Sequence, residues 1–251
     1  MTSRILVTGG TGTLGRLTVP LLREADSKVT ILSRRGHPPA AGIEYVAGDL
    51  LKGEGIEIAV DGAETIVHLA GGPKGDEVAT ANLMRAAARA GVRHVVLISV
   101  VGADRVPIGY FRSKLASERV VRDSGVPWTT LRAAQFHELV LKVAEAMAKL
   151  PVIPVPTGTR FQPVDAGEVA ARIAELALDS PLGLVDDIAG PRIHPASELI
   201  RGYLDAVGRR RLLLPVRLPG KGARALRAGA NLAPGRAVGR RTWEEFLAAR
   251  L

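Results

Sequence analysis

The chain has 251 residues, of which 47% are hydrophobic, and this length can bury one large domain together with a smaller lobe. No apolar run approaches the roughly 18 residues that cross a bilayer, so we expect no membrane-spanning segment and no membrane partner. The absence of cysteine excludes disulfides and thiolate metal sites and is typical of a cytoplasmic protein, and the five histidines lack metal-ligand spacing, so no metal is expected.

The formal net charge of +9 is concentrated at one end of the chain. Residues 201–251 contain twelve basic and three acidic side chains, whereas residues 1–200 are neutral overall. Leucines are interleaved with these arginines, and Trp243, Phe246 and Leu247 have helical spacing. We therefore expect this segment to pack on the substrate side, with its aromatic residues docked on the core. A DNA-binding arm is the alternative, and nucleic acid is not the expected partner.

The first predicted element is a buried strand at Ile5–Val7, so close to the first residue that no signal peptide is expected. A glycine-rich turn and then a helix follow the strand. Glycine lets the backbone turn sharply and approach a pyrophosphate, and the N–H groups of the helix start would face that anion. The alternative is an ordinary glycine-rich turn. The pattern favours a dinucleotide site, with these residues in the turn: Gly9, Gly10, Thr11, Gly12 and Gly15.

The second predicted strand, Val29–Leu32, ends at Ser33, Arg34 and Arg35. In dinucleotide-binding α/β folds, the end of the second strand meets the ribose of adenosine. An acidic residue there would bind the 2′-hydroxyl of NAD, whereas a hydroxyl and a guanidinium suit the 2′-phosphate of NADP. We expect NADP(H) to be preferred over NAD(H). The alternative is a solvated pair of surface arginines.

Two more predicted strands end at the same edge of the sheet. The strand at 44–47 leads to Asp49, which either accepts a hydrogen bond from the adenine amino group or caps a helix. The strand at 64–69 leads to Ala70, Gly71 and Gly72, whose small size would allow close approach of a cofactor.

Two polar residues near these strand ends are more ambiguous. His68 lies in the fourth strand and is expected to be packed and inert. Asn82 lies in the helix expected at 77–90, where it either bridges backbone groups near the site or simply lies on the helix surface.

A possible catalytic trio follows the fifth strand, which is predicted at 94–99 and ends in Ser99. Tyr110 and Lys114 are four residues apart, so on a helix they share one face. This trio suits hydride transfer with a coupled proton: the tyrosine exchanges a proton with the substrate oxygen, and the serine hydrogen-bonds that oxygen. The lysine would hold the nicotinamide ribose and favour the tyrosinate. The alternative is that this spacing arises by chance in a helix.

Strand and helix alternate through six units, the sixth strand being at 128–131, and this alternation predicts an α/β fold with a doubly wound parallel sheet. Helices are expected at 138–150, 166–178 and 196–207, with a proline-rich loop at 151–163. We expect a Rossmann domain at residues 1–190, with its substrate pocket partly from 133–165. The small C-terminal lobe would then comprise residues 191–251.

The runs VTGGTGTLGR, SRR, GDL, HLAGG, ISVVG and YFRSK, in this order, resemble the short-chain dehydrogenase/reductase superfamily, specifically its atypical, NmrA-like branch. The resemblance covers roughly residues 4–190. It implies that Thr13 and Leu14 join the glycines at the pyrophosphate, that Leu50 joins Asp49 at the adenine, and that Leu69, Ala70 and Gly71 lie near the nicotinamide half. It also implies that the loop at Ala134, Gln135 and Phe136 meets the nicotinamide.

Together these observations favour an NADP(H)-dependent oxidoreductase, a reductase of a small carbonyl, enone or similar electrophilic compound. A monomer or homodimer with a small-molecule substrate is expected. One alternative is a redox-sensing protein of the NmrA-like type that binds the dinucleotide without catalysis. Another is a nucleotide-sugar epimerase or dehydratase, for whose substrate lobe the chain leaves little room.

Overall fold

The structure is a computed structural model that describes residues 3–36, 38, 42–72 and 74–251. The chain folds into two compact units, and each unit draws on several segments of the sequence. The first unit comprises Met1–Ser99, Arg112–Leu131 and Gly167–Val185. The second comprises Val100–Phe111, Arg132–Ala166 and Asp186–Leu251.

The described residues of the first unit form a seven-stranded sheet. The order of its strands is β3-β2-β1-β4-β5-β6-β9. The neighbours whose register is defined pair in parallel. This arrangement confirms the predicted doubly wound fold. The strands are β1 (Arg4–Thr8), β2 (Lys28–Ser33), β3 (Ile43–Ala47), β4 (Thr65–His68), β5 (His94–Val100), β6 (Trp128–Ala133) and β9 (Gly183–Leu184).

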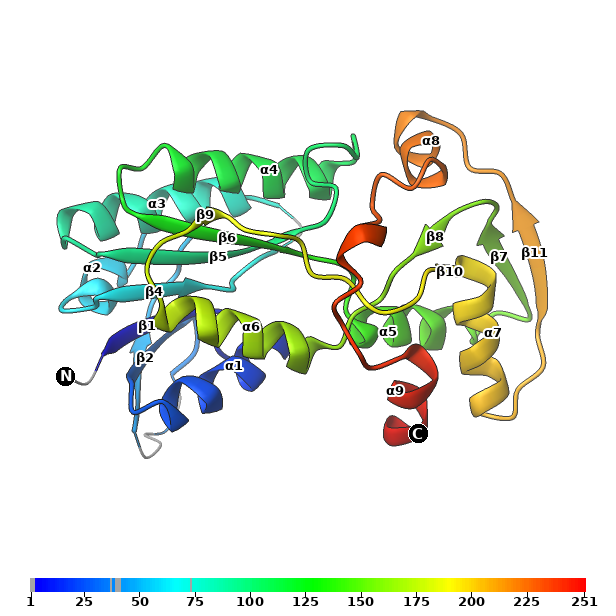
Figure 1. The fold of residues 1–251 in the computed structure, drawn as a ribbon, viewed down its shortest axis with the longest axis horizontal. Coiled ribbons are helices and arrows are strands. Elements are labelled where there is room, and N and C mark those ends of the chain that lie inside the picture. Colours follow the sequence, from blue (N-terminus) through cyan, green and yellow to red (C-terminus); the bar gives the residue numbers. More distant parts are fainter. Residues whose placement is uncertain (1–2, 37, 39–41, 73) are drawn as a thin grey trace. The chain divides into compact units, whose positions relative to one another are not determined.

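Helices cover both faces of this sheet, with α1 and α6 on one side and α3 and α4 on the other (Figure 1). Strand residues such as Leu6 and Ile66 are fully buried against Leu83 of α3 and Ile56 of α2. This burial explains why the sequences of these strands are almost entirely apolar. The helices are α1 (Thr13–Glu24), α2 (Ile56–Val60), α3 (Asp76–Arg89), α4 (Gly109–Arg122) and α6 (Ala166–Leu178). None of the helices in the described ranges is long and apolar enough to cross a membrane.

The strand order reverses at β1, and this reversal positions the site. From β1 the chain proceeds outward through β2 and β3, and it then returns to place β4 on the other side of β1. Thr8, the last residue of β1, is level with Leu32 of β2 and with His68 of β4. In open parallel sheets, ligands bind in the crevice beyond the carboxyl ends of the strands at such a reversal.

The second unit contains two small sheets and a helical core. Strands β8 and β10 pair antiparallel, and β7 and β11 pair in parallel. Trp243, Phe246 and Leu247 of α9 are buried among α5, α7 and β7, which confirms that they form a docking face. The elements are α5 (His137–Met147), β7 (Val152–Pro156), β8 (Arg160–Phe161), β10 (His194–Pro195), α7 (Ala196–Ala206), β11 (Leu212–Val216), α8 (Lys221–Arg227), η1 (Pro234–Arg236) and α9 (Trp243–Arg250).

The structure corrects one sequence prediction in this unit. The proline-rich loop expected at 151–163 contains the strands β7 and β8. Proline lacks an N–H donor, so it is disfavoured in a central strand. Each strand of a two-stranded sheet, however, has one edge that pairs with no other strand, and a proline nitrogen can lie on that edge. The prolines of β7 are therefore compatible with pairing to β11.

Candidate functional site

The glycines after β1 allow three backbone segments to meet. Gly9 has φ of +72°, and a Cβ on it would lie 2.6 Å from the backbone nitrogen of Ala70. A Cβ on Gly15 would lie 2.3 Å from the carbonyl oxygen of Gly9. A Cβ on Gly12, by contrast, would meet nothing closer than that same oxygen, at 3.3 Å. Gly9 and Gly15 are thus needed for packing, whereas a Cβ on Gly12 would make this one tight contact and meet no other atom within 4 Å.

The helix α1 begins directly after Gly12, so its positive end lies there. Its N-cap is Gly12, which has no side chain to accept the first N–H groups, and the first turn carries no acidic residue. The N–H groups at the start of a helix have no partner within the helix, and the helix dipole favours an anion there. Thr13 and Leu14 are the first residues of α1, so a helix start that suits an anion lies where the sequence predicted a pyrophosphate site.

A cavity of about 1000 Å³ lies along the carboxyl ends of the strands in the first unit. It brings together most of the residues predicted to bind the cofactor, whereas Gly10, Leu14 and Gly15 are buried. The lining residues are Gly9, Thr11, Gly12, Arg16, Leu32, Ser33, Arg34, Arg35, Gly48, Asp49, Leu50, Leu51, Leu69, Ala70, Gly71, Gly72, Lys74, Gly75, Asp76 and Ala79. Sequence reasoning missed Arg16, Lys74 and Asp76. A long cavity with a helix start on one wall and arginines at the end of β2 fits a dinucleotide phosphate.

The loop after β3 is fixed by side chains. Asp49 accepts hydrogen bonds at Oδ1 from the backbone N–H of Leu51 at 2.8 Å and of Lys52 at 3.3 Å. Asn82 of α3 donates from Nδ2 to the carbonyl oxygens of Leu50, at 2.7 Å, and of Leu51, at 3.3 Å. Asn82 therefore bridges backbone groups next to the cavity, which confirms one of its two predicted roles. Asp49 stabilises its own turn, and its contact with adenine stays a prediction.

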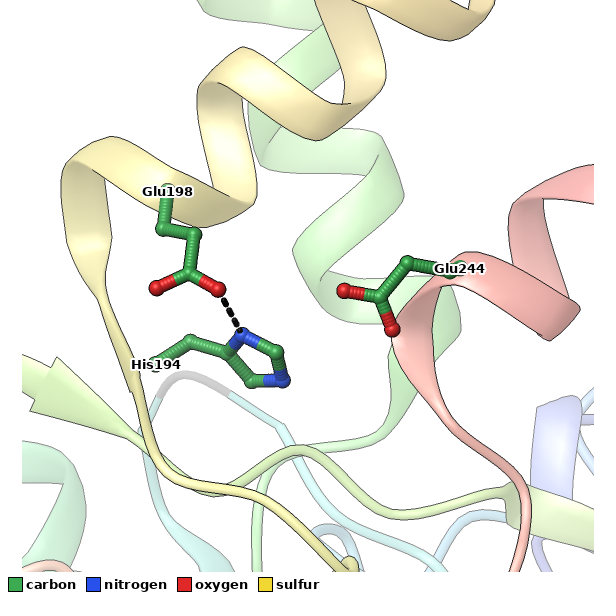
Figure 2. Close-up of side chains that lie close together, drawn as sticks. All are labelled: His194, Glu198 and Glu244. Atoms are coloured by element: carbon green, nitrogen blue, oxygen red, sulfur yellow. Dashed lines mark hydrogen bonds and ion pairs between the residues drawn. The ribbon is translucent and has the colours of Figure 1, made fainter.

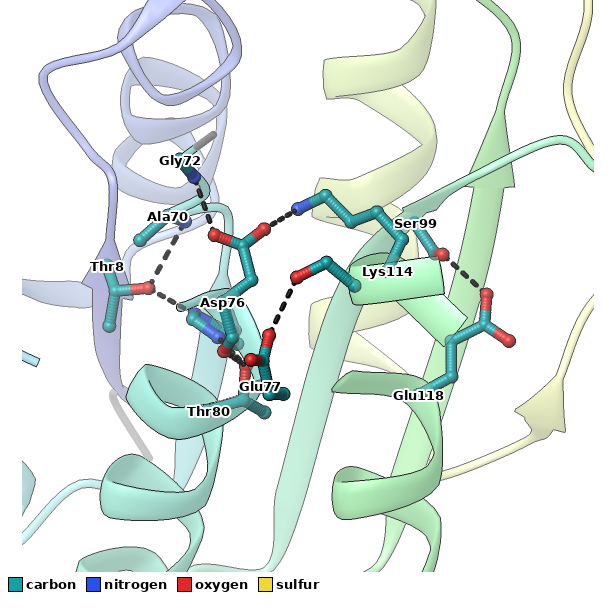
Figure 3. Close-up of polar contacts among 11 residues, drawn as sticks. Thr8, Ala70, Gly72, Asp76, Glu77, Thr80, Ser99, Lys114 and Glu118 are labelled. Atoms are coloured by element: carbon teal, nitrogen blue, oxygen red, sulfur yellow. Dashed lines mark hydrogen bonds and ion pairs between the residues drawn. The ribbon is translucent and has the colours of Figure 1, made fainter. Parts of the chain in front are cut away.

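The most buried charges of the site belong to Lys114 and Asp76 (Figure 3). The Lys114 ammonium lies 2.8 Å from Asp76 Oδ2, and the side chains are 10% and 7% exposed. Asp76 Oδ1 accepts a hydrogen bond from the backbone N–H of Gly72 at 2.6 Å. A Cβ on Gly71 would lie 2.7 Å from Lys114 Nζ, so the ammonium lies directly over this glycine. The lysine predicted to hold the ribose thus lies beside the cavity, and a carboxylate holds it there.

A buried chain of hydrogen bonds joins the ends of β1 and β4 to the start of α3. Thr80 Oγ1 donates to the carbonyl oxygen of Asp76, so it can only accept from His68 Nε2, which is 3.1 Å away. The neutral imidazole then accepts at Nδ1 from Thr8 Oγ1, at 2.6 Å, and Thr8 Oγ1 accepts from the N–H of Ala70. Burial, and next the charge of Lys114, lower the pKa of His68 to about 4. His68 is therefore neutral, and it is packed, as predicted.

The other two members of the predicted trio have different surroundings. Ser99 is buried, and its hydroxyl donates to Glu118 of α4 at 2.5 Å (Figure 3). Tyr110 lies in the first turn of α4, one turn before Lys114, and is 48% exposed with its ring edge-on to Phe111. Serine's hydrogen bond to the substrate therefore stays a prediction, since its proton is directed to a carboxylate.

The predicted nicotinamide loop belongs to the second unit. The backbone of Ala134 and Gln135 bonds to neighbouring segments of that unit, at Ile188 and Val164, and Phe136 precedes α5. Gln135 Oε1 is buried and has no hydrogen-bond partner among the described residues. The role of these three residues stays a prediction.

A second group of ionisable side chains lies elsewhere in the second unit (Figure 2). One ligand atom from each of His194, Glu198 and Glu244 lies within 4.8 Å of the others. His194 Nδ1 is 3.0 Å from Glu198 Oε1, and Glu244 also faces Arg192 at 3.8 Å. A neighbouring guanidinium opposes binding of a cation, so this geometry is accounted for by the hydrogen bond between His194 and Glu198 and the ion pair between Glu244 and Arg192.

Comparison with known proteins identifies the family. Residues 9–153 match the model of the NAD(P)H-binding family. The chain is 31% identical over 212 residues to a (4-alkanoyl-5-oxo-2,5-dihydrofuran-3-yl)methyl phosphate reductase from Streptomyces griseus, with 82% of this chain and 74% of that protein covered. It is 29% identical over 215 residues to the NAD(P)H azoreductase of Xenophilus azovorans, with the same coverage.

The fold is similar to that of NADPH-dependent quinone oxidoreductase from Escherichia coli, solved in complex with NADPH. The TM-score is 0.83 at 20% identity, and the match covers 98% of this chain and 99% of that one. The chain belongs to the NAD(P)H-binding family, which agrees with the resemblance to the atypical, NmrA-like branch of the short-chain dehydrogenases/reductases. It is an NAD(P)-dependent oxidoreductase.

Proposed function

We propose that this reductase uses NADPH in preference to NADH. The observation that carries this proposal is the pair of arginines, Arg34 and Arg35, that lines the cavity at the end of β2, where the adenosine ribose is bound in this fold class. Both side chains are exposed, and a guanidinium matches the geometry of a phosphate. The glycine turn and the start of α1 would hold the pyrophosphate, and Asp49 with Leu50 would hold the adenine.

The substrate is a small quinone, azo compound or enone that accepts two electrons. NADPH held in the cavity would supply a hydride, and the product needs one proton for each hydride. Tyr110 donates that proton from its hydroxyl, and Lys114 stabilises the tyrosinate that remains and holds the ribose. Asp76 fixes the position of Lys114 through the 2.8 Å ion pair. Support for this class of substrate comes from the azoreductase and the dihydrofuran reductase to which the chain is similar.

The direct test is oxidation of NADPH by the purified chain against a panel of one quinone, one azo dye, one enone and one simple aldehyde. We expect turnover with at least one conjugated electrophile, and less with NADH at equal concentration. A titration without substrate, followed by NADPH fluorescence, registers binding by itself. Tight binding without oxidation of NADPH by any compound would contradict the proposal and favour a redox-sensing role.

A further inference from the structure

The small sheet formed by β7 and β11 has two different faces. The strands pair in parallel, with Leu212 opposite Val152 and Leu214 opposite Pro154. Alternate residues of a strand point to opposite faces, and partners in register share a face. On one face, Ile153 is fully buried in the core of the second unit. The other face contains the two pairs named above and is exposed.

This outer face is apolar along its whole length. Leu212 is 66% exposed, Leu214 50% and Val152 40%, and the next pair on the same face is Pro156 with Val216. Single exposed leucines are ordinary, but a contiguous apolar row marks a surface that binds another apolar surface. Figure 1 shows the two strands side by side in the second unit.

Basic residues flank the two strands in the sequence and line a depression at one end of the sheet. The strands and their flanks, residues 148–158 and 208–222, contain no acidic residue but six basic ones: Lys149, Arg209, Arg210, Arg211, Arg217 and Lys221. A depression of about 610 Å³ at one end of the sheet is lined by Lys149, Pro151, Arg210, Arg211 and Leu212. Arg211 is fixed there because its guanidinium donates to the carbonyl oxygens of Ala148, at 3.2 Å, and Arg210, at 2.9 Å. The depression therefore combines positioned positive charge with apolar walls.

We propose that the outer face of β7 and β11, together with its basic rim, binds the surface of an anionic lipid bilayer. The leucines enter the boundary between headgroups and acyl chains, while the lysine and arginines meet the lipid phosphates. This surface binding needs no membrane-spanning segment, whose absence was the reason to expect no membrane partner.

Charge and chemistry favour a bilayer over two other occupants. A second copy of the chain, docked through the same face, would bring two identical basic rims together. Nucleic acid would satisfy the arginines, but the exposed row of leucine, valine and proline offers no hydrogen bond or aromatic ring to a base. A bilayer satisfies both the charge and the apolar row.

The test is co-sedimentation of the full chain with vesicles, either of pure phosphatidylcholine or of equal parts phosphatidylcholine and phosphatidylglycerol. We expect binding to the anionic vesicles, weakening as salt rises, and little binding to the neutral ones. Since each basic side chain near such a surface contributes about fivefold, Arg210→Gln with Arg211→Gln should reduce partitioning by about 25-fold. Leu212→Ser with Leu214→Ser should reduce it by at least about tenfold.

Matched controls are Leu178→Ser and Arg172→Gln, which change exposed residues of α6 in the first unit and should bind vesicles like the unaltered chain. Each variant is first shown to keep its thermal unfolding temperature and its affinity for NADPH. Equal binding to both kinds of vesicle would overturn the proposal. A dimer that binds no vesicle and that the leucine variants dissociate would also overturn it. So would a chain that binds random duplex DNA but no vesicle, if the arginine variants lose DNA binding and the leucine variants keep it.

Discussion

Lys114 and Asp76 form an ion pair of 2.8 Å between Nζ and Oδ2, with both side chains almost fully buried. Asp76 is the first residue of α3, and its other carboxylate oxygen accepts the N–H of Gly72. One carboxylate therefore fixes both the loop after β4 and the ammonium of α4. A lysine held in this way has less conformational entropy to lose when a cofactor binds.

Asp76→Asn should destabilise the chain by about 3–5 kcal/mol, because it leaves the buried ammonium without a counter-charge. Urea unfolding followed by circular dichroism measures the loss. The variant Asp76→Asn with Lys114→Met removes both charges and should recover most of the stability. A double variant as unstable as Asp76→Asn alone would show that the carboxylate acts through Gly72 and not through the ion pair.

Gly12 and Gly15 should respond differently to the same substitution. Gly15→Ala places a Cβ 2.3 Å from a backbone oxygen, so it should cost about 1–3 kcal/mol of stability. Gly12→Ala makes one contact, at 3.3 Å from the same oxygen, and should cost less, about 0.5–1 kcal/mol. That methyl group would separate the pyrophosphate from the start of α1, so the Kd for NADPH should rise roughly tenfold or more. Unchanged NADPH affinity in Gly12→Ala would place the pyrophosphate elsewhere.

Arg34→Ala should weaken binding of NADPH by about 1.5–3 kcal/mol and leave binding of NADH nearly unchanged, since only NADPH carries the 2′-phosphate. Fluorescence titration of both cofactors measures the difference. Arg35→Ala is the matched variant, because its side chain lines the same end of the cavity. An equal loss for the two cofactors, or none in either variant, would remove the basis for preferring NADP(H).

Features set by short stretches of sequence were predictable, and contacts between distant segments were not. The glycine turn and the strand ends were located because a parallel sheet brings all its carboxyl ends to one edge. The pairing of Asp76 with Lys114 depends on how α3 and α4 pack on the sheet, and the sequence of neither helix indicates its contact with the other. Glu118 was closer to being found: it follows Lys114 by four residues on α4, a spacing that puts both on one face, yet its bond to Ser99 requires the strand as well.

Stability should fall as the pH drops from about 6.5 to about 4. The pKa of His68 is lowered from 6.5 to about 4 by burial, so below pH 6.5 the unfolded chain binds a proton that the folded chain does not. The resulting loss is about 3 kcal/mol when it is complete near pH 4. His137, whose pKa burial also lowers to about 4, adds a similar loss. Urea unfolding at pH 7 and pH 4.5 measures the sum.

His68→Gln removes one titrating group, so the loss between these two pH values should shrink by the share of His68, whatever the variant's stability at pH 7. A loss as large as in the unaltered chain would mean that other groups carry the acid sensitivity.

Removal of one hydroxyl tests the proton donor. If Tyr110 protonates the substrate, Tyr110→Phe should keep nearly native affinity for NADPH, because the glycine turn, Arg34 and Lys114 are unchanged. Turnover alone should fall by about 10²–10⁴-fold, the range for loss of a positioned general acid. Stopped-flow oxidation of NADPH at saturating substrate measures this step. Tyr203→Phe removes a hydroxyl buried in the core of the second unit and is the matched control.

Lys114→Ala separates the two parts of the proposed chemistry. It should weaken NADPH binding as well as turnover, because Lys114 is proposed to hold the ribose and to stabilise the tyrosinate, whereas Tyr110→Phe should affect turnover alone. The pH dependence of turnover gives an independent readout. If the proton comes from solvent, turnover should fall as the pH rises, and it should fall to the same extent in both variants and in the unaltered chain. Full turnover in Tyr110→Phe would contradict this role and assign the proton to Lys114 or to a bound water.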